Sequence, residues 1–188
     1  MINYELPTQV NIDGTSYHIN RDGDYRMILD VIAALNDDSL SEQEKGYCAL
    51  CIFYDFNIPD NAQKAIDEMV IFLNAGEESK PDNKPPIMSW VQDFPLIVAP
   101  INKVLGCEVR AVKYMHWWTF VSGYMEIGEC SFSNIVNIRN KKRRGLKLDK
   151  QEQEFYNENR EKVDLKCTLN KEEQNFINNI LGINENFG

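Results

Sequence analysis

Apolar residues recur every three or four positions along most of this chain, and that spacing is the signature of amphipathic α-helices. Residues 25–32 show the pattern clearly, and it returns in several later segments. Ser41, followed three residues later by Glu44, forms a capping-box signature at the start of the second helical segment. The spacing therefore predicts a mainly α-helical, multi-helix fold of about seven helices.

The periodic segments also predict which side chains form the core. The second helix carries its expected stripe at Tyr47, Leu50, Cys51 and Tyr54, and the third at Ile66, Met69, Val70 and Leu73. The residues that we expect to be buried include Ile28, Leu29, Leu50, Val70, Ile97, and Trp117 or Trp118.

The N-terminal segment has a different character, because it alternates with the period of a β-strand. Two short runs at residues 8–12 and 15–19 are joined by Asp13 and Gly14. Asp-Gly suits a type I′ turn, in which both central residues have positive φ. We therefore predict a β-hairpin, which must pack on the helices because an isolated hairpin is marginal in water.

One proline-rich, charged stretch, residues 76–88, interrupts the helical pattern and is predicted to be a flexible linker. We expect a single domain over residues 1–188. Its parts are the hairpin at 8–20, a helical subregion at 24–75, the linker at 76–88, a second helical subregion at 89–145 and polar C-terminal helices at 148–182. Within the second subregion, Pro95 fits the first turn of a helix that begins late. Pro100 is expected to kink that helix or to separate two helices.

The charge of the chain is uneven. Its net charge is −9, which opposes nucleic-acid binding overall, yet residues 139–147 are densely basic. The start of the sequence lacks the features of a signal peptide, and no stretch reaches the ~18 apolar residues of a membrane span. We therefore expect an intracellular protein without membrane partners, whose five cysteines are reduced.

The segment YMHWWTF, residues 114–120, is the most unusual stretch. On a helix over residues 112–127, one apolar stripe comprises Tyr114, Trp117, Trp118, Val121 and Met125, widened by Phe120, Tyr124 and Ile127. The opposite face carries His116, Thr119, Gly123 and Glu126, which predicts that His116 faces water or a partner. The stripe is interpreted either as core or as a binding surface, since Trp and Tyr are frequent interface anchors.

Arg139 lies on the apolar stripe of the next predicted helix, residues 132–141. A buried guanidinium needs a carboxylate or carbonyl partners, so we expect an internal ion pair, with recognition of an acidic partner as the alternative. The following Lys141, Lys142, Arg143 and Arg144 are a candidate basic patch. They are expected to interact with the helix C-terminus, or with an acidic partner or phosphates.

No sequence motif indicates catalysis or a cofactor. The signatures of serine hydrolases, zinc proteases, P-loops and dinucleotide-binding loops are missing. Cys48 and Cys51 form a single CxxC inside an apolar helix, without the second ligand pair of a structural zinc site. The sequence therefore predicts a protein that is not an enzyme and that has no metal site and no cofactor.

The segment YMHWWTF, followed by FSNIVNIRNKK, resembles the bacteriophage gene-product-fifteen (Gp15) family. The matching residues are Tyr114, His116, Trp117, Trp118, Phe120, Ile138 and Arg139, whereas Met115 replaces the usual leucine. The resemblance implies a phage or prophage protein encoded among tail genes, just before the tape-measure gene. That position implies a tail assembly chaperone acting in the cytoplasm of the bacterial host, with the tape-measure protein as partner and possible self-association.

Two other functions remain open at this point. One is a structural tail or connector component of the virion, and the other is a nucleic-acid-binding or regulatory phage protein. The residues considered for partner binding are Tyr114, His116, Trp117, Trp118, Phe120 and Arg139.

Overall fold

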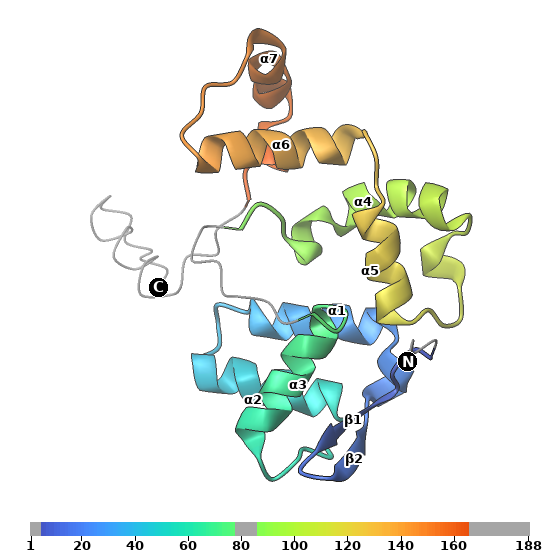
Figure 1. The fold of residues 1–188 in the computed structure, drawn as a ribbon. Coiled ribbons are helices and arrows are strands. Elements are labelled where there is room, and N and C mark those ends of the chain that lie inside the picture. The colour runs from blue at the N-terminus through green and yellow to red at the C-terminus, as the bar shows by residue number, and fades with distance from the viewer. Residues whose placement is uncertain (1–4, 78–85, 166–188) are drawn as a thin grey trace, which may run out of the picture.

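The computed structural model describes residues 5–77 and 86–165, and within them the chain is mainly α-helical (Figure 1). The hairpin consists of β1 (Gln9–Ile12) and β2 (Thr15–His18). The helices are α1 (Tyr25–Leu35), α2 (Glu42–Phe53), α3 (Ala62–Leu73), α4 (Trp90–Leu105), α5 (Trp117–Met125), α6 (Ser131–Arg143), α7 (Lys150–Glu158) and α8 (Arg160–Val163). Two 3-10 turns, η1 (Asn20–Gly23) and η2 (Val109–Ala111), connect them. The predicted fold class, a helical protein with an N-terminal hairpin, is confirmed.

The hairpin has the predicted turn. Asp13 and Gly14 both have positive φ, 52° and 82°. The strands pair antiparallel, with Gln9 opposite His18 and Ile12 opposite Thr15. Asp13 accepts hydrogen bonds from Asn61 and Lys64 at the start of α3, and Ile12 joins the core. The hairpin is therefore held on α3.

Side-chain caps fix the beginnings of several helices. The predicted capping box is confirmed, because Ser41 accepts from the amide of Glu44 while Glu44 accepts from the amide of Ser41 at 2.8 Å. Ser89 caps α4, since its hydroxyl accepts from the amide of Gln92 at 3.3 Å. This early start puts Pro95 at the sixth position of α4 and not in its first turn, so that expectation was wrong. One helix runs through Pro100, and it does not separate two helices.

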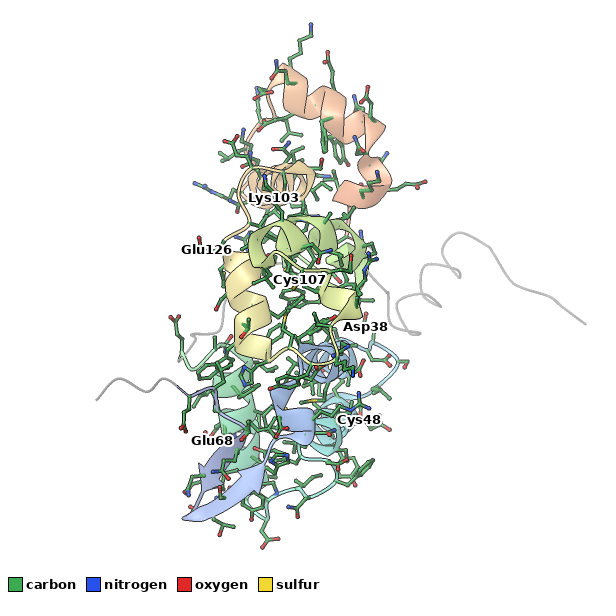
Figure 2. All side chains as sticks on the ribbon, turned by 90° about the vertical axis from the view of Figure 1, so that its right-hand side faces the viewer. Asp38, Cys48, Glu68, Lys103, Cys107 and Glu126 are labelled. Carbon is green, nitrogen blue, oxygen red and sulfur yellow. The ribbon has the colours of Figure 1, made fainter. Side chains whose placement is uncertain are left out.

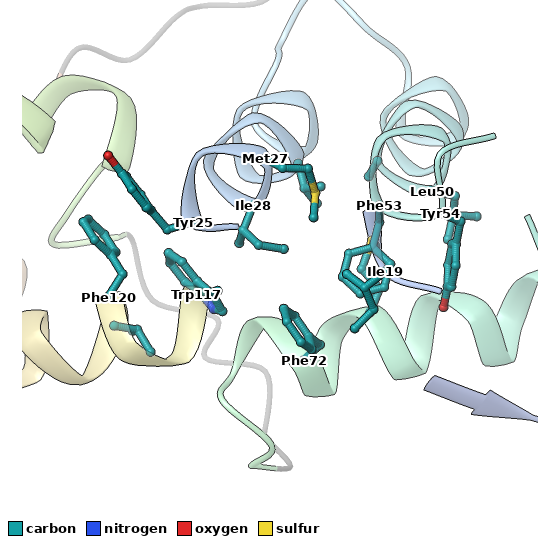
Figure 3. Packing of buried hydrophobic residues seen from close by; sticks show 14 of the residues in the cluster. Ile19, Tyr25, Met27, Ile28, Leu50, Phe53, Tyr54, Phe72, Trp117 and Phe120 are labelled. Carbon is teal, nitrogen blue, oxygen red and sulfur yellow. The ribbon is translucent and has the colours of Figure 1, made fainter. Parts of the chain in front are cut away.

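The elements stack in three layers, which Figure 1 shows from bottom to top. The hairpin and α1–α3 form one layer, α4 and α5 the middle layer, and α6 and α7 the layer beyond. A single apolar cluster joins the first two layers (Figure 3), with Tyr25, Phe53, Phe72, Trp117 and Phe120 among its largest members. A smaller cluster around Ile135, Ile138 and Val163 holds α6 and α8 together.

The core agrees with the predicted residues at most positions. Ile28, Leu50, Ile97 and Trp117 are buried, and Leu29 is half-buried. Val70 is 38% exposed, so its assignment to the core was wrong. The reason is rotational: the buried face of α3 runs through Ala65, Met69 and Phe72, to one side of the predicted stripe.

Tyr47 was also assigned to a buried stripe, yet it is 64% exposed. Leu50, Cys51 and Tyr54 follow the prediction and are buried. Tyr47 is the first member of the stripe, one turn before the part of α2 that contacts the core. Periodicity identifies the apolar face of a helix but does not show where along the helix its coverage ends.

The region of polar C-terminal helices predicted at 148–182 contains α7 and α8, which meet at Asn159. Its part beyond residue 165 lies outside the described residues. Cys48, Cys51, Cys107 and Cys130 are free thiols, and Figure 2 shows Cys48 and Cys107 in different layers.

Candidate functional site

The segment around His116 connects the first layer to the middle layer. Residues 112–116 precede α5 without helical structure, with Val112 and His116 in extended conformations, and α5 begins only at Trp117. The prediction of a helix from residue 112 was therefore wrong at its start. The helix begins late because His116 acts as its N-cap, with Nδ1 accepting the amide N–H of Trp118 at 3.1 Å.

Asp24 holds this segment against the start of α1. Its carboxylate accepts from the amide of Met115 at 3.1 Å, while the amide of Tyr25 donates to the Met115 carbonyl at 2.9 Å. Arg26 pairs with Asp24 and also donates to the carbonyls of Val112 and Lys113. Burial raises the pKa of the Asp24 carboxyl, but the bonds from Arg26 and Met115 outweigh it and leave that pKa below its usual value.

The two tryptophans contact the first layer at the C-terminal end of α3. The indole N–H of Trp117 donates to the carbonyl of Leu73 at 2.9 Å, and that of Trp118 donates to the carbonyl of Phe72 at 2.9 Å. Both acceptors belong to the last turn of α3, whose carbonyls lack the amide partner four residues on that the helix interior provides. The carbonyl of Phe72 also accepts from the amide of Ala75 at 3.1 Å. We call these two bonds the tryptophan clasp. The motif therefore joins the C-terminus of α3 to the N-terminus of α5.

His116 itself is buried, with 2% of its surface exposed, so the prediction that it faces water or a partner was wrong. Its ring contacts Phe72 at a centroid distance of 5.5 Å and Trp118 at 5.9 Å. Because Nδ1 accepts a hydrogen bond, the proton lies on Nε2, which donates to the carbonyl of Pro7 at 3.0 Å. Burial lowers the pKa of His116, so the neutral imidazole is the folded form.

This environment makes stability depend on pH. The unfolded chain takes up a proton at His116 as the pH falls through 6.5, whereas the folded chain takes it up only at lower pH. Unfolding is then coupled to proton uptake, so the free energy of unfolding falls below pH 6.5 by at most about 1.4 kcal/mol per pH unit. Urea titrations between pH 7.5 and 5 measure this slope.

The control is His116→Asn, which preserves a capping acceptor but does not titrate. We expect a shallower dependence of the free energy of unfolding on pH for that variant than for wild type. Equal slopes in wild type and His116→Asn would contradict the described burial of a neutral ring.

The other aromatic candidates divide between core and surface. Phe120 is fully buried and stacks on Tyr25 at a centroid distance of 4.3 Å. Tyr114 is 50% exposed, and its hydroxyl donates to the carbonyl of Asp22 at 2.9 Å. Trp118 is half-buried above Gly76, where a Cβ would lie 3.0 Å from the indole. Of these aromatic candidates, Tyr114 is the only exposed one.

Arg139 lies in a separate layer, where the expected internal ion pair is confirmed. It is bidentate with Asp93 of α4, at 2.6 and 2.9 Å, and both side chains are buried. Its other donors bind the carbonyls of Ile87, Lys162 and Val163. All five N–H donors of the guanidinium are therefore used internally. Sequence reasoning did not identify Asp93, although it lies four residues before Ile97 on the buried face of α4.

The basic run ends α6, as predicted from the helix dipole. Lys141 pairs with Glu152 of α7, and Lys142 donates to Asp164 at 2.6 Å and to Tyr156 at 2.8 Å. Arg143 is half-buried and donates to Asn140, whereas Arg144 is exposed. Acidic groups of the chain itself thus neutralise both lysines, which weakens the case for phosphate binding.

The fold and these contacts define a class of protein. It is a layered helical protein whose conspicuous His, Trp and Arg residues hold its layers together. In residues 5–77 and 86–165, no group of three or more His, Cys, Asp or Glu is arranged to hold a metal ion. No helix in the same ranges has the length and apolar character needed to cross a membrane.

The family model described as Bacteriophage Gp15 protein matches residues 2–165, and the chain belongs to this family. The resemblance inferred from the aromatic motif is confirmed. No curated protein and no solved structure matches the chain. Membership supports a structural or assembly role in a bacteriophage.

Proposed function

We propose that this phage protein is a tail assembly chaperone that binds the tape-measure protein in the cytoplasm of the bacterial host. Its task is to cover the long helical tape-measure protein until the tail tube forms around it. Membership of the Gp15 family supports the setting in phage assembly. The partner is proposed from the position among tail genes that the family resemblance implies.

The observation that carries a binding function is the exposure of large aromatic rings. Tyr47, Phe56 and Tyr114 are exposed by 64%, 80% and 50%. Trp, Tyr and Arg dominate the energetics of protein interfaces, and any aromatic ring buries a large apolar area on contact. A chain that keeps such rings in water, while it buries Trp117, has apolar surface to offer a partner.

The proposed mode of binding is helix-in-groove recognition. An amphipathic tape-measure helix places its apolar residues, spaced by three or four, against the exposed rings of the chaperone. Each contact is small, so many copies bind along one long partner, and neighbouring copies contact one another weakly. Binding then withholds the apolar faces of the tape-measure protein from aggregation.

Co-expression with the tape-measure protein encoded by the same phage tests this function. We expect the wild-type chain to increase the soluble fraction of the tape-measure protein and to co-purify with it. An unrelated helical protein of similar size and charge is the control. A tape-measure protein that stays insoluble, or soluble without co-purification, would contradict the proposal.

Mass spectrometry of purified phage particles distinguishes the two hypotheses, an assembly chaperone and a structural component of the virion. A chaperone is expected to be absent from mature particles. Stoichiometric presence in the tail would instead support the structural component.

A further inference from the structure

Phe56, immediately after α2, combines high exposure with an unfavourable backbone conformation. It is 80% exposed, more than any other large apolar residue in the described ranges, and its φ is 62°. Its neighbour Asp55 has a φ of 49°. Bulky side chains rarely adopt this left-handed region, which glycine and asparagine occupy at helix C-termini. The chain therefore carries an aromatic ring where local stability favours a small or polar residue.

The ring of Phe56 has little role in closing the helix. The turn is closed by backbone bonds, from the amide of Phe56 to the carbonyl of Cys51 at 3.0 Å and from Asn57 to Tyr54 at 2.9 Å. Glycine or asparagine at position 56 would make the same bond. Residues that keep an unfavourable backbone conformation cluster at functional sites.

The surroundings of this helix are strongly acidic. Residues 24–75 contain ten Asp or Glu and only three Lys or Arg. Those three cations already pair with acids of the chain: Arg26 with Asp24, Lys45 with Glu42 and Lys64 with Asp13. Exposed carboxylates lie before and within the first turn of α2 and beyond its end, at Asp37, Asp38, Glu42, Glu44, Asp55 and Asp60. With ten acids and three cations, this region carries an excess of negative charge at its surface.

We propose that Phe56 and Tyr47, the two exposed rings at α2, anchor an amphipathic helix whose apolar stripe is flanked by Lys or Arg. We call this the acidic aromatic surface, defined by Tyr47, Phe56, Asp55 and Asp60. The rings supply apolar contact, and the carboxylates select a basic flank and exclude an acidic one. The inference rests on the proposed function, because it assigns the binding surface and the chemistry of the tape-measure segment.

The test uses variants that change the ring without disturbing the turn. Phe56→Asn removes the ring and suits a positive φ, Phe56→Tyr restores an aromatic ring, and Asp55→Asn with Asp60→Asn removes two charges. Met125→Asn, at a 73% exposed residue of α5, is the matched control for loss of an exposed apolar side chain. Each is co-expressed with the tape-measure protein and then titrated against overlapping tape-measure peptides.

We expect Phe56→Asn to weaken peptide binding at least about tenfold, as an interface anchor would, while its thermal midpoint equals or exceeds that of wild type. Phe56→Tyr and Met125→Asn are expected to bind like wild type. The bound peptides are expected to be amphipathic and net positive, with affinity that falls with salt and in Asp55→Asn/Asp60→Asn.

The outcomes separate the two proposals. If wild type and Phe56→Asn bind the tape-measure protein equally well, the proposed acidic aromatic surface is wrong, but the proposed chaperone function still holds. Bound peptides that are neutral or acidic would overturn the charge selection. Wild type that binds neither the tape-measure protein nor any of its peptides would overturn the function and, with it, this inference.

Discussion

Replacing Arg139 by methionine is expected to lower the free energy of unfolding by about 3–5 kcal/mol, because it leaves the Asp93 carboxylate buried without its counter-charge. The substitution also strips partners from the carbonyls of Ile87, Lys162 and Val163. Two of those carbonyls end α8, so we expect the layer of α6–α8 to loosen first. Urea unfolding measures the loss, and hydrogen exchange at α8 locates it.

A double-mutant cycle attributes this loss to the ion pair. Asp93→Leu alone leaves the Arg139 guanidinium buried without its counter-charge. We expect it to lower the free energy of unfolding by a similar amount. The double variant Asp93→Leu/Arg139→Met should cost less than the two single variants together, since no unpaired charge remains. Additive effects, or single losses below about 1 kcal/mol, would contradict a buried pair of this kind.

Trp117→Ala is expected to destabilise the fold by about 3–5 kcal/mol, through a cavity between the first and middle layers and the loss of one bond of the tryptophan clasp. Trp118→Ala should cost less, because Trp118 is only half-buried. The exposed control Met125→Ala is expected to stay within about 0.5 kcal/mol of wild type. Chemical unfolding followed by circular dichroism gives all three values. A loss for Trp117→Ala as small as that of Met125→Ala would show that the ring is not core.

Much of the secondary structure followed from local signals in the sequence. Asp13-Gly14 specified the hairpin turn, and Ser41 with Glu44 specified the start of α2. Both signals act within four residues, through the local backbone and neighbouring side chains, so distant contacts do not alter them. The identity of the family also followed from two segments, residues 114–120 and 132–142.

The arrangement of the site could not be predicted from the sequence, because it depends on contacts between residues far apart in the chain. His116 appeared polar and exposed on a helical projection, but the projection assumed a helix where Asp24, 92 positions earlier, holds extended backbone. His116 then caps α5 and is buried by Phe72 and Trp118. Arg139 was correctly expected to need an acid, yet its partner could be named only once α4 and α6 were in place.

Phe56 is the opposite case, since nothing in the periodicity set it apart. It directly follows the predicted stripe of α2, and an apolar residue there is ordinarily assigned to the core. Its exposure and its positive φ depend on how α2 ends, at the left-handed residues 55 and 56. The spacing of apolar residues does not show which residue has an unfavourable backbone conformation. Phe56 was therefore identified as a candidate only from the structure.

We propose that the residues that hold the layers together and the residues that bind a partner form two separate groups. The tryptophan clasp, His116 and the Asp93–Arg139 pair belong to the first group, and the exposed rings are proposed for the second. The motif shared with the family would then mark a common fold, with partner choice set by side chains such as Phe56 and Tyr47.

Trp118→Phe tests this division most directly. It removes the indole donor to the Phe72 carbonyl, which still accepts from the amide of Ala75, so the expected cost is only about 1 kcal/mol. The decisive measurement is co-purification of the tape-measure protein with this variant and with wild type, at a temperature where circular dichroism shows both to be folded. The account predicts equal capture. A folded Trp118→Phe variant that captures several-fold less than wild type would place the double tryptophan on the binding surface and contradict the account.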